Sequence, residues 1–405
     1  MWAEVTGLGA ALAGGACAAE IWRRNMHLWL PSYLGSRTEP FIPGQPLHLY
    51  FCFVDHYEPL WAGANVATGA ERVERWVREY PALVDQFPDS DGRPPQHSFF
   101  YPAEEYRPEY LDALQSLCAK GYGDVEIHLH HDNDSQQNFL DSMEQFIQRL
   151  QGHGFLLNRG RRNRFGFIHG NWCLDNSRKD GRWCGLNNEI DLLCKLGCYA
   201  DFTYPSAPSD TQPAMANSIY YSRDDVQRPK SHNRGRLSRV GTAPAEDELC
   251  LITGPLGLNF RSRKLGIFPR LENADINGGI RADAHRCREW LRLGARVLGA
   301  PNHVFVKVHT HGTQENLYPA VLGDQARAMY RHLVEMQRDG LKLHYVTAYE
   351  MWQTVRSLEQ GLDPVSKISE GKTYLDSAAS DAIRATAASA TRPVEARATV
   401  SGGGL

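Results

Sequence analysis

The sequence predicts an α/β fold in which parallel strands are covered by outer helices, most simply closed as a distorted (β/α) barrel of about seven strands. Short apolar runs alternate with amphipathic helical segments about seven or eight times between residues 45 and 360, and this alternation is typical of a parallel sheet. Several apolar runs also end in a polar cluster rich in His and Asp. Because the carboxyl ends of parallel strands meet on one face, these clusters predict a shared site there.

The charge pattern and the cysteine count narrow the class of protein. The 405 residues carry a formal net charge of −3, and the longest basic tract is RGRRNR at residues 159–164, which implies no nucleic-acid partner. Nine cysteines are an odd number, which argues against a complete disulfide framework and favours a reducing compartment. Cys173, Cys184, Cys194 and Cys198 lie close in sequence but form no CxxC pair, which argues against a structural zinc site.

We expect an N-terminal extension at residues 1–44, a main domain at 45–360 and a disordered tail, rich in Ser, Ala and Thr, at 361–405. Residues 7–19 are too short and too weakly apolar to span a bilayer, and no basic residues precede them as they would in a secretion signal. Residues 21–34 would form an interfacial helix or, as we favour, pack against the domain. A cytoplasmic or peripheral membrane location is therefore expected, with no clear transmembrane segment and with export left open.

The elements of the first half follow from two patterns. The run LYFCFV at residues 49–54 is apolar on both faces, as in a buried parallel strand. A helix follows at 70–87, where apolar residues recur at helical spacing. The same patterns predict strands at 98–101, from 125, at 165–168 and at 199–203, and helices at 108–120, 135–151 and 187–196.

Residues 209–248 interrupt this order. They are polar and dotted with Pro, Gly and Asn, which predicts a long insertion with little regular structure lying over the site. The alternation then resumes, with strands at 249–253, 303–308 and 342–346 and helices at 282–298, at 320–338 and from 347.

The stretch DVEIHLHHDND at residues 124–134 is the richest in potential ligands. Its apolar residues alternate with Glu126, His128 and His130, so His128 and His130 point to the same face of a strand. Imidazoles and carboxylates together are the ligands of zinc, or of iron, cobalt or manganese. The structural alternative is a polar strand end whose Asp134 caps the following helix, with Gln137 completing a capping box.

Other strand ends carry the same residue types, and this favours one shared site. The polar groups that follow the remaining strands are Asp55 and His56, then His169, Asn171 and Trp172, then Tyr204, and finally His309 and His311. In a parallel α/β fold these groups would gather at one end of the sheet.

The order of these motifs resembles that of the polysaccharide deacetylases of carbohydrate esterase family 4. In FVDHYEP, Asp55 matches the first residue of the family's Asp pair and His56 stands in place of the second. Glu126 and Ile127 set the register of the second motif, so that His130 matches its first His and Asp134 falls on its second. The two segments LGCYADFTYP and FVKVHTHG are similar to later motifs, with Asp201 and His309 at the matching positions. The family's Arg motif is replaced by IHGNWCLDN at residues 168–176. The resemblance spans roughly residues 45–355.

The resemblance implies hydrolysis of acetyl groups on a polysaccharide, oligosaccharide or amino sugar by a water activated on a divalent metal, with zinc the first choice. His56, His130 and Asp134 would be the metal ligands, with His128 a competing one. Asp55 would be the base, His309 the acid with His311 as its rival, and Asp201 a support for either. Further candidates for contact with the substrate or for orienting it are His169, Asn171, Trp172, Tyr204, Arg270 and Glu272.

Each assignment has a structural alternative, and two other functions stay open. His56 would instead support the ligands from behind, Trp172 and Tyr204 would be lids of the core, and Arg270 and Glu272 would belong to surface ion pairs. The first alternative function is a metal-independent glycoside hydrolase that pairs Asp55 with Asp201 or Glu272. The second is a non-catalytic sugar-binding protein on the same barrel.

Overall fold

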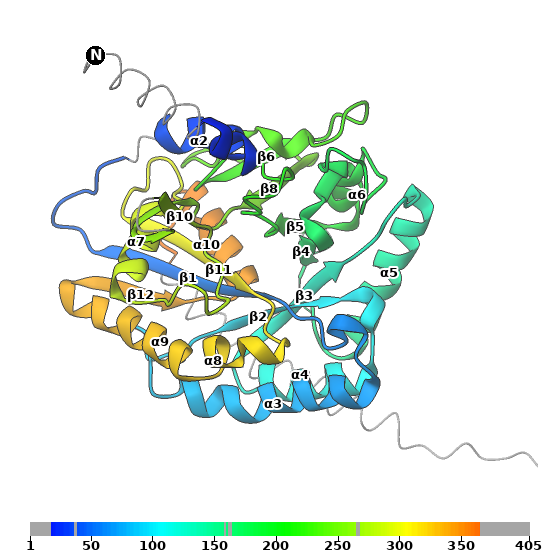
Figure 1. Ribbon diagram of the computed structural model, residues 1–405, viewed down its shortest axis with the longest axis horizontal. Coiled ribbons are helices and arrows are strands. Elements are labelled where there is room, and N and C mark those ends of the chain that lie inside the picture. The colour runs from blue at the N-terminus through cyan, green and yellow to red at the C-terminus, as the bar shows by residue number, and fades with distance from the viewer. Residues whose placement is uncertain (1–17, 36–38, 158, 161–163, 265–267, 365–405) are drawn as a thin grey trace, which may run out of the picture. The chain divides into compact units, whose positions relative to one another are not determined.

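The computed structural model describes residues 18–35, 39–157, 159–160, 164–264 and 268–364 (Figure 1). The strands are β1 (Leu47–His56), β2 (His97–Pro102), β3 (Gly123–Leu129), β4 (Phe165–His169), β5 (Cys198–Asp201), β6 (Ile219–Arg223), β7 (Arg236–Leu237), β8 (Glu248–Ile252), β9 (Gly257–Lys264), β10 (Phe268–Glu272), β11 (His303–Thr310) and β12 (Leu341–Tyr345). The α-helices are α2 (Met26–Gly35), α3 (Val66–Val84), α4 (Pro108–Cys118), α5 (Gln136–Gly152), α6 (Glu189–Leu196), α7 (Ala284–Leu293), α8 (Tyr318–Val321), α9 (Asp324–Met336) and α10 (Ala348–Glu359). Residues 365–405, which hold most of the predicted tail, lie outside the described residues.

The fold is mixed α/β with one large, mostly parallel sheet, as predicted. The ladder runs in the order β11-β1-β2-β3-β4-β5-β8-β6-β7, and β12 pairs with β1 as well. All pairings from β11 to β8 are parallel, whereas β6 runs antiparallel to β8 and β7. The carboxyl ends of the parallel strands therefore share one end of the sheet.

No ladder among the described strands joins β8 to β11, so the sheet is not closed by backbone pairing. A side chain crosses this interval instead. Lys307 of β11 donates from Nζ to the carbonyl oxygens of Phe202 (2.6 Å) and Tyr204 (2.5 Å), in the segment that follows β5. A Cβ on Gly254 would lie 2.4 Å from the carbonyl oxygen of Lys307, which brings the end of β8 close to β11 as well. Closure as a barrel stays a prediction.

The first strand is buried on both faces, as its unbroken apolar run predicts. From Leu49 to His56 every residue of β1 is buried. The strand pairs with β11, β12 and β2, and helices cover it. The helices α3 and α4 lie side by side below the sheet in Figure 1, and α9 contacts both α3 and α7. The helix α3 begins at Asn65, whose side chain accepts a hydrogen bond from Thr68 N.

Two predicted helices are shorter than expected, because each meets a glycine that close packing requires. The helix expected at 282–298 ends at Gly294, where a Cβ would lie 2.4 Å from Val304 Cγ1. The helix expected at 320–338 is divided into α8 and α9 at Gly323, where a Cβ would lie 2.9 Å from Pro319 Cα.

The segment 209–248 has more regular structure than expected. It contributes β6 and β7, and β6 pairs with β8 over five residues. Aromatic and apolar residues of β6, such as Tyr220 and Tyr221, are buried, which explains why this polar segment extends the sheet. The hairpin of β9 and β10 is likewise a strand pair that the sequence pattern missed.

The helix α2 packs against the domain, which was the favoured alternative. Trp29 is completely buried in a small apolar cluster with Ala207, Ala216 and Leu256. In the part of the chain that the structure covers, no helix is long and apolar enough to cross a membrane.

Candidate functional site

Three potential metal ligands converge beyond the carboxyl ends of β1 and β3. Nε2 of His128 lies 3.3 Å, and Nε2 of His130 lies 3.2 Å, from Oε1 of Glu58. His128 and His130 share a face of the chain, as their alternation predicts, and their ring centroids are 4.5 Å apart. We call Glu58, His128 and His130 the open cluster.

Hydrogen bonds to the opposite ring nitrogens fix how the two imidazoles face Glu58. Nδ1 of His128 is 2.8 Å from the carbonyl oxygen of Ile168, and a carbonyl can only accept, so Nδ1 carries the proton. Nδ1 of His130 is held in the same way by Glu104 Oε1, 2.5 Å away. In their neutral forms both rings therefore point an Nε2 lone pair at a carboxylate oxygen, an arrangement that requires a positive charge between them.

The electrostatics of the open cluster agree with this requirement. Burial lowers the pKa of His130, but the neighbouring carboxylates of Glu104 and Glu58 outweigh burial and raise it to about 10. Burial raises the pKa of Glu58, but His128 and His130 hold it well below its usual range. The second carboxylate oxygen of Glu58 is buried and has no hydrogen-bond partner among the residues that the structure describes, which is unusual for a buried polar atom. A divalent cation bound by the three residues would satisfy this oxygen and both lone pairs, so the donor set fits a metal ion.

The open cluster is accessible from one side only. The side chain of His128 is completely buried, whereas that of His130 is 32 % exposed. Access is therefore along His130 and Glu104. A site with three protein ligands and one accessible side is typical of catalytic rather than structural metal centres.

Two more of the predicted histidines border the open cluster. His56 packs edge-on against His128, with ring centroids 4.9 Å apart, and its other side stacks on His311 at 4.6 Å. Burial lowers the pKa of His56 well below its usual range, so it is a neutral ring. Trp61, which is 44 % exposed, lies beyond His311 with ring centroids 6.4 Å apart. An exposed aromatic ring beside the open cluster can stack on a sugar.

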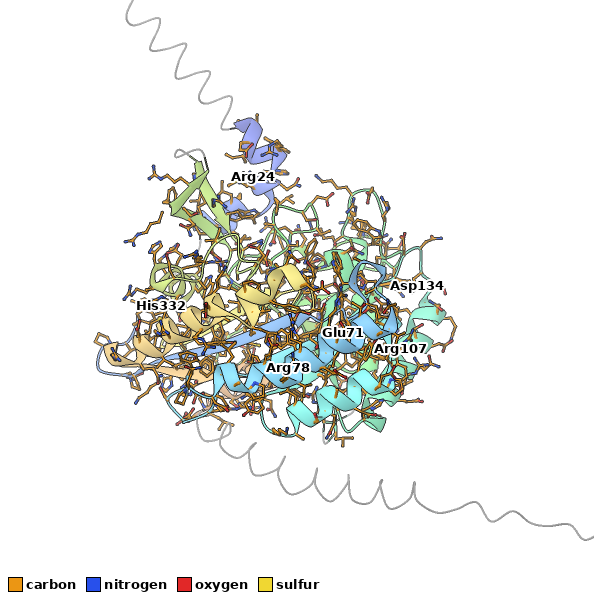
Figure 2. The ribbon with its side chains drawn as sticks, turned by 60° about the horizontal axis from the view of Figure 1, so that its bottom comes forward. Arg24, Glu71, Arg78, Arg107, Asp134 and His332 are labelled. Carbon is orange, nitrogen blue, oxygen red and sulfur yellow. The ribbon has the colours of Figure 1, made fainter. Side chains whose placement is uncertain are left out.

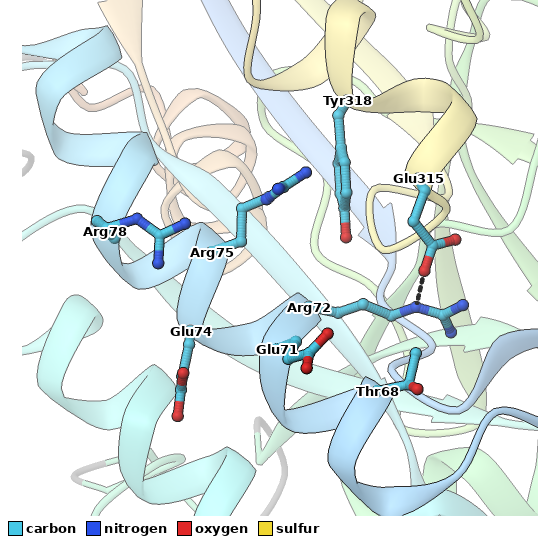
Figure 3. Close-up of a pocket in the computed structure, with 8 residues that line it drawn as sticks. All are labelled: Thr68, Glu71, Arg72, Glu74, Arg75, Arg78, Glu315 and Tyr318. Carbon is cyan, nitrogen blue, oxygen red and sulfur yellow. Dashed lines mark hydrogen bonds and ion pairs between the residues drawn. The ribbon is translucent and has the colours of Figure 1, made fainter.

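Arg72 of α3 holds the loop that carries Glu58 and Trp61. Its Nη1 donates to the carbonyl oxygens of Pro59 (2.8 Å) and Trp61 (3.1 Å), and its Nε pairs with Glu315 Oε1 at 2.6 Å. Figure 3 shows this ion pair in a shallow hollow along α3 that is lined mainly by charged side chains. Arg72 thus positions the loop from the α3 side, through backbone carbonyls and one ion pair.

Asp134 and His169 lie in a different group from the open cluster. One oxygen of Asp134 accepts hydrogen bonds from Ser135 N and Asn138 Nδ2, both at 2.7 Å, and the other lies 3.1 Å from Nδ1 of His131. Figure 2 labels Asp134 beside the start of α5. The N-cap of α5 is Ser135, whose side chain accepts from Asn138 N, so the structural alternative in which Asp134 caps this helix is wrong. Nε2 of His169 lies 2.8 Å from Nε2 of His131.

Asp55 points away from the open cluster, because neighbouring side chains on a strand face opposite sides. It is completely buried, and its carboxylate accepts hydrogen bonds from His97 Nε2 (2.9 Å) and Gly312 N (2.6 Å). A Cβ on Gly312 would lie 2.2 Å from Asp55 Oδ2, so this contact requires glycine. These two hydrogen bonds of the predicted base therefore hold β1 against β2 and the loop after β11. Its catalytic role stays a prediction.

Asp201 and His309 are both buried and lie outside the open cluster. The carboxylate of Asp201 accepts hydrogen bonds from Thr203 N (3.1 Å) and Thr203 Oγ1 (2.7 Å), and burial raises its pKa to about 7. Burial lowers the pKa of His309 well below its usual range, and its ring centroid is 6.3 Å from that of His56. Of the two rivals on β11 and its end, His311 is therefore the nearer to His56, the ring that packs against His128.

The remaining candidates divide between core and surface. Glu272 is buried and pairs with Arg286 Nε at 2.8 Å, so the expected surface ion pair is not formed there. Arg270 is exposed on β10. Tyr204 is buried with its hydroxyl 2.8 Å from His232 Nε2, which agrees with a role in the core. Asn171 and Trp172 are half-buried in a turn after β4 where both have positive φ.

Glu58 in the open cluster and Glu104 beside it are not among the metal ligands predicted from the sequence. A signal existed for Glu58, which follows His56 by two residues and thus shares its face if the chain stays extended. Glu104 lies just after β2, where the barrel prediction also places site residues, but no motif marks it.

Comparison with protein-family models and with curated proteins found no match. The resemblance to polysaccharide deacetylases therefore depends on the motifs alone.

Proposed function

We propose that the protein is a metal-dependent hydrolase that removes acetyl groups from a polysaccharide or an amino sugar, as a divergent polysaccharide deacetylase. The observation that carries this proposal is the convergence of one carboxylate, Glu58, and two imidazole Nε2 atoms, of His128 and His130, at the carboxyl ends of parallel strands. The three ligands implied by the family resemblance are also one carboxylate and two imidazoles.

The ligand set proposed here differs from the one expected from the motifs. Glu58 takes the place of Asp134, and His128 takes the place of His56, while His130 is common to both. Zn²⁺ suits this combination of nitrogen and oxygen donors, and when bound it lowers the pKa of water to about 7 and polarises a carbonyl. Glu104 keeps the proton of His130 on Nδ1, and Ile168 does so for His128.

The chain's own residues supply the remaining functions. His311 is half-buried and stacks on His56, which suits it to give a proton to the departing amine or alcohol. Trp61 would stack on the sugar ring that carries the acetyl group. We also propose that Lys307 completes the closure of the distorted barrel around this end, because it joins β11 to the segment after β5.

The carboxylate-pair hydrolase has less support. Asp55 and Glu272 are both buried, and each is already paired, with His97 and with Arg286. Neither has an oxygen free to receive a glycosidic leaving group or a water molecule.

Acetate release from N- and O-acetylated oligosaccharides tests the proposal. The protein supplied with Zn²⁺ should release acetate, and a chelator should stop it. Glu58→Gln and His128→Asn should lower the rate at least ~100-fold, since each removes a ligand. His332→Gln is the matched control, because His332 is on the surface of α9 (Figure 2), where it pairs with Glu335. Absence of acetate release with any divalent metal, or full activity of Glu58→Gln, would show that the proposal is wrong.

A further inference from the structure

A second group of potential ligands lies behind the open cluster. His131, His169, Cys184 and Glu189 each offer one ligand atom, and these four atoms all lie within 4.8 Å of one another. His169, Cys184 and Glu189 are completely buried, and the side chain of His131 is only 6 % exposed. We call these four residues the closed cluster.

In the closed cluster, Nε2 of His131 and Nε2 of His169 face each other, and these two nitrogens cannot both be hydrogen-bond acceptors. Nδ1 of His169 is 2.6 Å from the carbonyl oxygen of Gly170, so it carries the proton and Nε2 carries a lone pair. That lone pair faces Nε2 of His131 at 2.8 Å and Oε1 of Glu189 at 3.4 Å. Nδ1 of His131 lies 3.1 Å from Oδ2 of Asp134 but makes no hydrogen bond among the described residues. Either a proton on Nε2 of His131 or a cation at the centre satisfies the lone pair of His169.

The sulfur of Cys184 is placed as a fourth donor. It lies 3.4 Å from Oε2 of Glu189, and the backbone N–H groups of Asn176 (3.3 Å) and Leu186 (3.4 Å) point at it. Two N–H donors stabilise a thiolate and are the kind of outer contact that metal-bound sulfur receives. The thiol of Cys184 also donates to the carbonyl oxygen of Leu186 at 3.5 Å. Cys173, eleven residues earlier in the same loop, likewise donates its thiol to a carbonyl oxygen, that of Asn171, which makes it a matched comparison.

The backbone brings Cys184 to the histidines by close contact between two loops. Asp134 N donates to Cys184 O at 2.9 Å, and Trp183 N donates to Asp132 Oδ1 at 2.6 Å. Gly185 has a φ of +100°, and a Cβ there would lie 2.6 Å from Asp134 N. A glycine is thus required for the loop to approach the end of β3.

We propose that His131, His169, Cys184 and Glu189 bind a structural zinc ion. Thiolate and imidazole donors together select Zn²⁺ over the cations that prefer oxygen. Four protein ligands leave no position for water, which is typical of structural sites, so the ion would tie the loop after β4 and the start of α6 to the end of β3. This inference does not depend on the proposed hydrolytic function.

Zinc content and X-ray absorption at the zinc edge test the proposal. The wild-type protein should bind two equivalents of Zn²⁺, one in each cluster. A His128→Asn variant should keep about one equivalent, whose spectrum includes one sulfur neighbour at about 2.3 Å. Adding Cys184→Ser should remove that sulfur signal and the remaining zinc, whereas adding the matched change Cys173→Ser should preserve both. Replacement by Co²⁺ should give a thiolate-to-cobalt absorption band with the same dependence on Cys184.

Failure can be recognised without relying on a folded Cys184 variant. Zinc bound to the His128→Asn protein with only nitrogen and oxygen neighbours would overturn the proposal. Absence of bound zinc after incubation of this variant with Zn²⁺ would also overturn it. A proton on His131 would then lie between the two imidazoles. Either result would leave acetate release by the wild-type protein as a separate question.

Discussion

The carboxylate of Asp55 accepts a hydrogen bond from Nε2 of His97, 2.9 Å away, and both side chains are completely buried. This contact places the predicted base on the face of β1 that packs against α3, where Trp76 Nε1 donates to the same Gly312 that Asp55 holds. Asp55 is therefore expected to matter first for stability.

Asp55→Asn should lower the free energy of unfolding by about 1–3 kcal/mol, because it removes the charge from two buried hydrogen bonds. Denaturant unfolding measures the change. Asp112→Asn is a suitable control, since Asp112 also pairs with a histidine, His153, but is exposed, and its change should cost less than about 1 kcal/mol. Unchanged stability together with lost acetate release would instead favour a catalytic role for Asp55.

Glu104→Gln should weaken zinc binding at the open cluster about 10–100-fold, because Glu104 orients His130 without itself being a proposed ligand. Competition with a metal-binding dye measures the affinity, and excess Zn²⁺ should restore activity. Glu109→Gln, an exposed change in the first turn of α4, should bind zinc as the wild type does. An unaltered affinity for Glu104→Gln would contradict the assignment of His130 as a ligand.

Trp61→Ala should raise KM for an acetylated oligosaccharide several-fold and leave kcat and zinc content nearly unchanged, because a stacking platform contributes to binding alone. Steady-state kinetics with substrates of increasing length make the comparison. The exposed Trp22 of the N-terminal segment provides the control, and its change to Ala should leave KM as it is. A fall in kcat with constant KM would place Trp61 in the chemical step.

Asp201 should make the protein less stable as pH rises from about 4 to about 7. Its pKa is about 7 in the folded protein and about 4 in an unfolded chain, so over this range the folded state keeps a proton that the unfolded state has lost. This stabilisation by the protonated carboxyl, on the order of a few kcal/mol, is complete below pH 4 and is lost as the pH rises through 7.

Asp201→Asn tests this pH dependence, because the amide does not titrate. The free energy of unfolding of the variant, relative to that of the wild type, should increase between pH 4 and pH 7. Urea unfolding at several pH values measures it. A constant difference between the two proteins would show that the Asp201 carboxyl is ionised throughout.

Much of the fold follows from local patterns. The unbroken run at residues 49–54 predicts a strand buried on both faces, and β1 is one. The alternation in DVEIHLHHDND predicts that His128 and His130 share a face, and both contact Glu58. The end of α7 at Gly294 could not be predicted in this way, since it depends on contact with Val304 of β11.

By itself, the sequence determined the alternation of strands and helices and the end of the sheet where imidazoles gather, because both depend on the periodicity of the chain. Only the tertiary structure decided which histidines belong together. His130 and His131 are adjacent, yet one faces Glu58 and the other faces Glu189, because successive side chains leave an extended backbone in opposite directions. Ligands as far apart in sequence as Glu58 and His130, or His131 and Glu189, meet only when parallel strands are paired in register, and no local pattern records that pairing.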